Sequence, residues 1–296
     1  ERLALREEFH LGWRDSSGCL PVWLIELLPS PQRANEARGH WKHSPLATRP
    51  LVRIPFASCL PWQEAKDVLD SFIRSPDAEL RAPAIRSLVL SVRFSRSAVG
   101  ELLSFAQARR NEQDPVRLAM LSAMTQLPTK LWQSEHLDSL GVVVRHALDA
   151  TDISFGTASE IQKLVVRLLP VFPEWSTAWL ATVVKERGNF GYVDLSLWLS
   201  DEEARRIAPV LLPVLNSWST RERQNELLSA ASSFGRRLRV FPELVALLEG
   251  IARSTASVSN PGMVMYILKQ YVPESFRELV PRLIAADPSW MTQATV

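Results

Sequence analysis

Two histidines and two cysteines are the residues of this sequence whose types first suggest chemistry. His40 and His43 stand in the segment "HWKH", between Cys19 and Cys59, and imidazole and thiolate are ligands that zinc prefers. Zinc sites are usually built from closely spaced pairs such as CxxC, whereas each cysteine here stands alone. The spacing therefore favours a polar loop anchored by Trp41 over a metal site. We expect neither a metal nor a cofactor.

Acidic side chains adjacent in sequence are the next candidates, because carboxylates can serve as general acids and bases. The two runs are "REE" at 6–8 and "DEE" at 201–203. Asp201 and its neighbours stand where a predicted helix begins, and negative charge there favours the helix dipole. The sequence has no GxSxG motif and no glycine-rich phosphate loop. We therefore expect a protein that is not an enzyme, and we keep a hydrolase site near His43, within the first 61 residues, as an alternative.

Tryptophan and arginine are the commonest anchors of protein interfaces, and both are plentiful here. Ten tryptophans accompany three tyrosines, and Trp175 and Trp179 are spaced to share one face of a helix. Arg86, Arg167 and Arg223 would form a track for an acidic peptide or a phosphate backbone if they lined one wall. We predict these five residues as partner contacts. The alternative is structural: tryptophans that fill space between helices, and arginines that suit helix ends.

The composition describes a folded protein of ordinary charge. The 296 residues are 46% hydrophobic, and 34 basic against 32 acidic side chains give a net charge of +2. A charge this small cannot drive tight phosphate binding unless basic residues gather in a local patch. Two cysteines are too few for a disulfide-stapled scaffold, so we expect a cytoplasmic protein, although a single bridge remains an alternative. The apolar run at 19–28 contains Glu26 and is half of the roughly 20 residues that a membrane span needs, so no membrane helix is expected.

The first 61 residues differ in texture from the rest of the chain. They hold ten glycines and prolines, which break long helices. Residues 8–25 could form two strands and a turn, or a short helix after Pro21, and the polar segment 30–50 is predicted to be a connector or a mobile loop. The chain begins at Glu1 without a methionine, which suggests a piece of a larger regulatory protein or a processed chain. We expect residues 1–61 to cap the following domain or to link it to an upstream one.

From Trp62 onward apolar residues recur at the spacing of amphipathic helices. Proline, aspartate, serine, asparagine or glycine stands at the boundaries, as expected for helices joined by short turns. The predicted helices span residues 62–74, 77–92, 96–110, 114–127, 130–148, 155–171, 174–187, 189–199, 201–217, 219–235, 240–254, 260–271 and 274–286.

One short pattern occurs three times in these helices. Residues 80–88, 116–124 and 161–169 align with apolar residues at the first, fifth, sixth and ninth places. On a helix those places cluster on one side. The copies begin about 36 and about 45 residues apart, which is the length of two helices and two turns. The pattern therefore predicts stacked helical hairpins.

The seventh place of the pattern is polar. It is occupied by Arg86, Ser122 and Arg167, and it points away from the apolar stripe. Each of the three helices is thus expected to bury one stripe and to expose one polar site in the same register.

At these residues the sequence resembles HEAT and armadillo-type repeats. The segments "SPDAELRAPAIRSL" and "EQDPVRLAMLSAM" carry an acidic or proline-bearing turn, an aliphatic residue followed by arginine, and then small and apolar residues. The resemblance implies an all-α, right-handed α-solenoid of about six hairpins over residues 62–296. It also implies that Arg81 and Arg117 bridge to an acidic residue in a neighbouring unit. The third copy departs from the pattern at Gln162, and the arginine signature is absent after residue 171.

The resemblance implies binding without chemistry. We expect a scaffold or recognition module that holds a protein or peptide partner on the concave surface of the solenoid. The alternative is a nucleic-acid-binding protein like the HEAT-like DNA glycosylases, which grip the duplex with a basic concave surface. Acidic residues are interspersed along the same helices, which favours the peptide.

Overall fold

The computed structural model describes residues 14–15, 18–187, 194–253 and 260–288. Every regular element in these ranges is a helix, which confirms the predicted all-α class. The chain divides into two compact units, residues 1–160 (unit 1) and 161–296 (unit 2). The predicted domain boundary after residue 61 stays a prediction. In the described ranges no helix is both long and apolar enough to cross a membrane.

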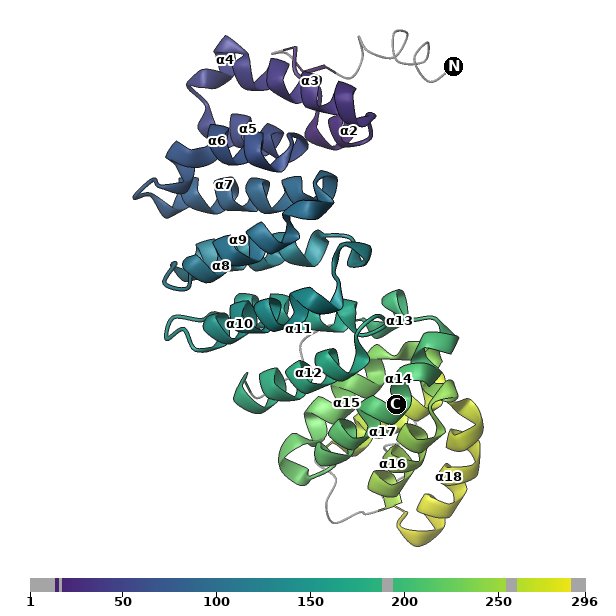
Figure 1. Cartoon of the computed structure of the whole chain (residues 1–296). Helices are drawn as coiled ribbons and strands as arrows, with labels where there is room; N and C mark the ends of the chain where they lie inside the picture. Colours follow the sequence, from purple (N-terminus) through teal and green to yellow (C-terminus); the bar gives the residue numbers. More distant parts are fainter. Residues whose placement is uncertain (1–13, 16–17, 188–193, 254–259, 289–296) are drawn as a thin grey trace. The chain divides into compact units, whose positions relative to one another are not determined.

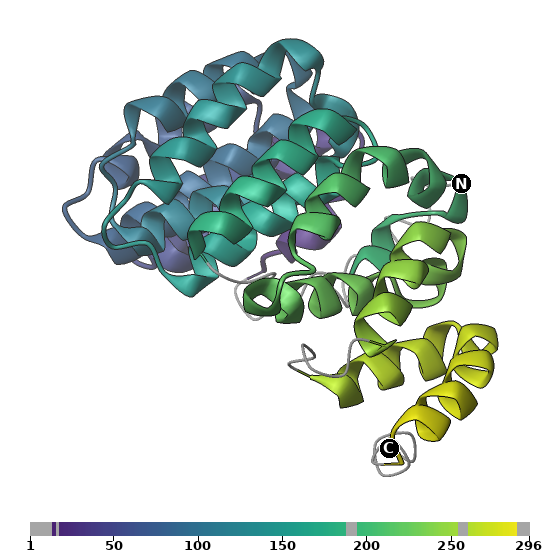
Figure 2. The same ribbon diagram turned by 90° about the horizontal axis from the view of Figure 1, so that it is seen from below.

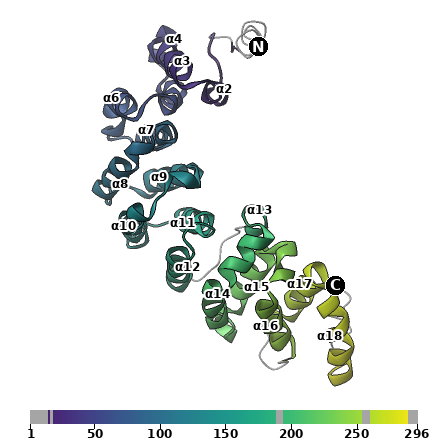
Figure 3. The ribbon, with the colours of Figure 1, turned by 45° about the vertical axis from the view of Figure 1, so that its right-hand side comes forward.

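Unit 1 is built of paired helices. Helix α7 packs against both α6 and α9, and α8 packs against α10. Figure 3 shows the result: α6, α8 and α10 form one row, and α7 and α9 form a second row beside it. The main helices of unit 1 are α2 (Val22–Glu26), α3 (Ser30–Lys42), α4 (Ser44–Ala47), α5 (Pro50–Arg53), α6 (Trp62–Ile73), α7 (Ala78–Ser91), α8 (Val99–Ala108), α9 (Asp114–Gln126) and α10 (Leu137–Leu148). They follow one another as successive layers in Figure 1.

Helix α11 (Phe155–Leu168) contains the division between the two units. In unit 2, α12 packs on α14, and α17 packs on α15, α16 and α18. Figure 2 shows the last of these helices, coloured green to yellow, packed side by side. The elements of unit 2 are α12 (Pro173–Arg187), α13 (Leu195–Trp198), α14 (Asp201–Ser217), the 3₁₀ turn η6 (Arg221–Arg223), α15 (Gln224–Ser233), the 3₁₀ turn η7 (Gly235–Val240), α16 (Pro242–Arg253), α17 (Pro261–Tyr271) and α18 (Pro273–Ala286).

The helix ends follow the local signals in the sequence. The Asp77 side chain accepts a hydrogen bond from the Glu79 amide and starts α7. Helix α14 begins with a capping box, in which Ser200 and Glu203 each bond the backbone of the other. These bonds from Ser200 lower the pKa of the Glu203 carboxyl. Asp201 lies in the first turn of α14, as predicted, whereas the acidic run at 6–8 lies outside the described residues.

The predicted repeat pattern coincides with the core. Every aligned apolar side chain in the three copies is buried, except the half-buried Leu80. The side chains at the seventh place, which were expected to be exposed, are half-buried. The apolar stripe therefore decides which face of these helices points inward, because each buried Leu, Ile or Met stabilises the fold by about 1.5 to 3 kcal/mol.

The segment predicted to be a loop, residues 30–50, is instead largely helical. Helix α3 begins with Pro31 in its first turn and packs on the 3₁₀ turn η1 (Ile54–Cys59). Its buried face consists of Arg33, Ala34, Ala37 and His40, which are polar or small. An apolar periodicity does not detect such a face. Of the two alternatives for residues 8–25, the short helix after Pro21 is present as α2.

The predicted helix over 130–148 is also shorter than expected. Trp132 and Gln133 have extended backbone, and α10 begins only at Leu137. Trp132 is buried, and His136 accepts a hydrogen bond from the Gln133 amide at 3.1 Å. These contacts stabilise a tight turn in place of the first helical turns. Most of the predicted helix over 189–199 lies outside the described residues, and α13 is the part of it that the structure describes.

Candidate functional site

The structure places the five predicted contact residues in two different units. Arg86 lies on α7 in unit 1, and Arg167, Trp175, Trp179 and Arg223 lie in unit 2. The half-buried Arg86 guanidinium donates to the Ser122 hydroxyl at 3.4 Å and to the Gln126 amide oxygen at 3.0 Å. Both acceptors belong to α9, so Arg86 joins two neighbouring helices of the stack.

In unit 2 the two tryptophans meet as their spacing predicted. The rings of Trp175 and Trp179 lie 6.2 Å apart, and both side chains are half-buried on α12. Arg223 donates to the carbonyl oxygens of Val184 at 2.9 Å and Lys185 at 3.1 Å, in the last turns of α12. Arg223, in the 3₁₀ turn η6, therefore caps the end of α12. This is the structural alternative, an arginine that suits a helix end. Arg167 is half-buried on α11.

The residues considered for zinc serve in the packing of unit 1. Cys19 and Cys59 are buried free thiols, and burial raises the pKa of the Cys59 thiol to about 11. His40 accepts the Leu20 N–H at Nε2 over 3.0 Å, and burial lowers the pKa of its imidazole. In the described ranges no three His, Cys, Asp or Glu side chains gather in a way that could hold a metal ion.

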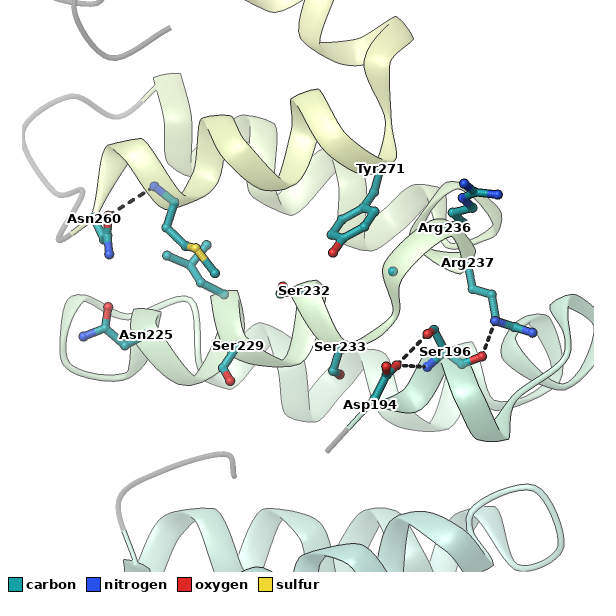
Figure 4. Close-up of a pocket in the computed structure, with 13 residues that line it drawn as sticks. Asp194, Ser196, Asn225, Ser229, Ser232, Ser233, Arg236, Arg237, Asn260 and Tyr271 are labelled. Atoms are coloured by element: carbon teal, nitrogen blue, oxygen red, sulfur yellow. Dashed lines mark hydrogen bonds between the residues drawn. The ribbon is translucent and has the colours of Figure 1, made fainter. Parts of the chain in front are cut away.

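A hollow that was not predicted lies within unit 2. We call it the serine groove; its volume is about 720 Å³. It runs between α15 and α17 and ends at α13 and η7, as Figure 4 shows. Its lining residues are Asp194, Ser196, Asn225, Leu228, Ser229, Ser232, Ser233, Gly235, Arg236, Arg237, Asn260, Met263 and Tyr271.

One side of α15 forms the floor of the serine groove. Asn225, Ser229, Ser232 and Ser233 recur at helical spacing and carry small polar side chains, whereas Leu228 between them is buried. From the facing helix, Tyr271 points toward α15 (Figure 4). The groove therefore offers hydroxyl and amide groups above an apolar base.

The end of the groove at η7 is held by a close backbone contact. Gly235 has φ +53, and a Cβ there would meet the Ser196 Cβ at 3.1 Å. The Arg237 guanidinium donates to the Ser196 carbonyl, and the Asp194 carboxylate accepts from the Ser196 amide at 2.9 Å. Glycine is needed here both for its left-handed backbone and for the short approach.

The side chains of four polar lining residues make no hydrogen bond within the described part of the chain: Asn225, Ser232, Arg236 and Tyr271. Ser232 and Tyr271 are half-buried, and the other two are exposed. Donors and acceptors held in a hollow in this way can bond a ligand without first breaking an internal bond. The arrangement suits recognition of a polar chain, such as a peptide backbone.

The sequence contains a signal for this groove that is neither a charge cluster nor a catalytic motif. In "NELLSAASSF", hydroxyl and amide residues recur at i, i+4 and i+7, which describes a polar stripe on one helix face. Only the opposing helix α17 turns that stripe into a groove. No protein-family model, curated protein or solved structure matches the chain.

Proposed function

We propose that this protein is a HEAT-like α-solenoid that acts as a non-catalytic scaffold and holds a peptide segment of a partner protein in the serine groove. The repeat architecture is supported by a ladder of polar contacts in unit 1. Arg81 pairs with Glu112 at 3.1 Å, and Arg117 pairs with Asp152 at 2.9 Å. Glu112 stands just before α9 and Asp152 just before α11, which agrees with the bridging role that the resemblance implies for these arginines.

The single observation that carries the binding function is the set of unbonded polar groups in the serine groove. Asn225 and Ser232 are seven residues apart on α15. At about 1.5 Å per residue they are separated by roughly 10 Å along the helix axis. An extended peptide advances about 3.3 Å per residue, so this span matches about three peptide residues. A short extended segment could therefore bond both ends of the stripe.

The charges around the groove favour a peptide over a nucleic acid. Arg236 and Arg237 are accompanied by Asp194 in the lining, and Arg237 lies 3.8 Å from the Asp201 carboxylate. Phosphate-backbone binding needs an excess of positive charge. The nearly balanced charge of this groove suits uncharged peptide groups better.

The proposal is tested by selecting random-sequence peptides on the purified full chain and measuring the selected peptides by fluorescence anisotropy. Ser232→Leu places an apolar side chain into the groove and is expected to abolish binding. The matched control is Ser104→Leu at an exposed position on α8, which should leave affinity unchanged. Tyr271→Phe removes one hydroxyl and should weaken binding by about two- to tenfold.

Two results would contradict the proposal. Selected peptides could bind the wild type and the Ser232→Leu variant equally. Alternatively, the chain could bind duplex DNA with an affinity that falls steeply with salt, in competition with the peptides.

A further inference from the structure

A second hollow of unit 2 borders the end of η7. We call it the arginine groove; its volume is about 680 Å³. Arg205, Ala208, Pro209 and Leu212 line it from α14, and Arg239 and Val240 line it from η7. The start of α16 closes it with Pro242 and Glu243.

The floor of the arginine groove is apolar. On α14 the residues at i+3, i+4 and i+7 from Arg205 are Ala208, Pro209 and Leu212, so they form one helix face. Leu212 is only half-buried. This face would gain stability from an apolar side chain placed on it, because contact with a ligand would remove it from water.

Two prolines interrupt the backbone hydrogen bonding of α14 along this face. Pro209 lies inside α14 and has no N–H, so the carbonyl of Arg205 lacks its usual helical donor. Pro213 leaves the carbonyl of Pro209 in the same situation.

Each wall of the arginine groove carries an arginine whose side chain has no partner among the described residues. Arg205 and Arg239 are both exposed, and neither side chain makes a hydrogen bond or ion pair within the described ranges. They come from different elements, α14 and η7, on either side of the apolar floor. Glu243 is the acidic residue of the lining and is also exposed.

We propose that the arginine groove binds a short peptide segment in which an apolar side chain is flanked by acidic residues. Guanidinium groups bind carboxylates through paired hydrogen bonds, and an apolar side chain between the acids would cover the floor. A nucleic acid fits this groove less well, because its phosphates would gain nothing from Leu212, Val240 and Pro242. The inference rests on the proposed function only in that both sites bind a protein partner.

The test uses a fluorescein-labelled peptide in which leucine and phenylalanine are flanked by glutamates, titrated with the full chain. The double variant Arg205→Gln/Arg239→Gln should weaken binding by at least about tenfold. The matched control is Arg277→Gln/Arg282→Gln, which removes two exposed arginines of α18 and should leave binding unchanged. A probe with glutamine in place of glutamate should bind at least about tenfold more weakly than the acidic probe.

Several outcomes would overturn the inference: no binding of the acidic probe, equal loss in both double variants, or equal binding of the glutamine probe. Displacement of the probe by duplex DNA would assign the groove to nucleic acid instead.

The variant Ser232→Leu distinguishes the arginine groove from the serine groove. It should leave binding of the acidic probe unchanged, and loss of the probe in this variant would place the probe in the serine groove and refute the second site. Conversely, failure of the random-peptide selection would not affect the result with the acidic probe.

Discussion

Both units contain a hollow walled by arginines, and the two hollows differ in how those arginines are paired. In unit 1 a hollow of about 610 Å³ is lined by Arg81, Arg109 and Glu112. Glu112 pairs with Arg81 at 3.1 Å and with Arg109 at 2.7 Å. In the arginine groove of unit 2, Arg205 and Arg239 have no such partner within the described ranges.

The difference separates arginines that hold the protein together from arginines that are free to bind something else. Arg117 is 4% exposed and bonds Asp114, Asp152 and the Glu112 carbonyl. This side chain is buried and its bonds go to groups of the fold, so it offers little to a partner. Counting arginines along the sequence does not distinguish the two kinds, because pairing depends on residues that are 30 or more positions away, such as Asp152 for Arg117.

The largest expected effect is at the core of unit 1. Leu121→Asp places a carboxylate at a fully buried position on α9, and it should destabilise unit 1 by more than about 4 kcal/mol. Circular dichroism during urea denaturation measures the change. Val142→Asp on α10 is the matched control at a side chain that is 41% exposed, and it should cost no more than about 0.5 kcal/mol. Unchanged helicity and melting temperature in Leu121→Asp would show that the predicted helix register is wrong.

The next effect tests the structural arginines directly. Arg117→Met leaves Asp114 without its buried cation and removes the bridge to Asp152, so we expect a loss of about 2 to 3 kcal/mol in the free energy of unfolding. Arg253→Met in unit 2 removes a surface pair with Glu249 and should cost less than about 1 kcal/mol. Equal losses in the two variants, measured by chemical denaturation, would remove the distinction between the two kinds of arginine.

A smaller effect is expected at η7, the turn shared by the two grooves of unit 2. Gly235→Ala forces a residue with a Cβ into the left-handed region and against Ser196, and should cost about 1 to 2 kcal/mol. Gly250→Ala is the matched control within α16, where a Cβ meets nothing within 4 Å, and it should stabilise the helix by about 0.5 to 1 kcal/mol. Thermal unfolding monitors both variants. A stabilising Gly235→Ala would mean that η7 has a different backbone conformation.

Much of the fold could be predicted because its helices carry their own signals. The boundaries of α14 agree with the predicted 201–217, since Ser200 and Glu203 cap its start and the apolar stripe continues to Leu215. Helix α3 could not be found in this way, because its buried face includes Arg33 and His40. Arg33 lies 3.5 Å above the Phe94 ring, and His40 packs edge-on against Phe56. Those partners are distant in sequence and supply the apolar contacts that the segment lacks.

The candidate site was less predictable than the fold. Trp175 and Trp179 come together because residues four apart on a helix always do. For Arg223, by contrast, local spacing gave no indication that both donors would cap the end of α12. The serine stripe of α15 and the apolar face of α14 were both readable as helix faces. The serine stripe becomes a groove only because α17 packs against α15. The apolar face of α14 becomes a groove only because η7 packs against α14.

The sequence by itself determined where most helices of this protein begin and end and which of their faces are buried. These properties arise from contacts within a few residues or from a regular spacing, so they are encoded locally. The tertiary structure alone decided which polar side chains find partners within the chain and which are left facing a hollow. That outcome depends on side chains brought together from separate helices, and only the packed helices determine which of them meet.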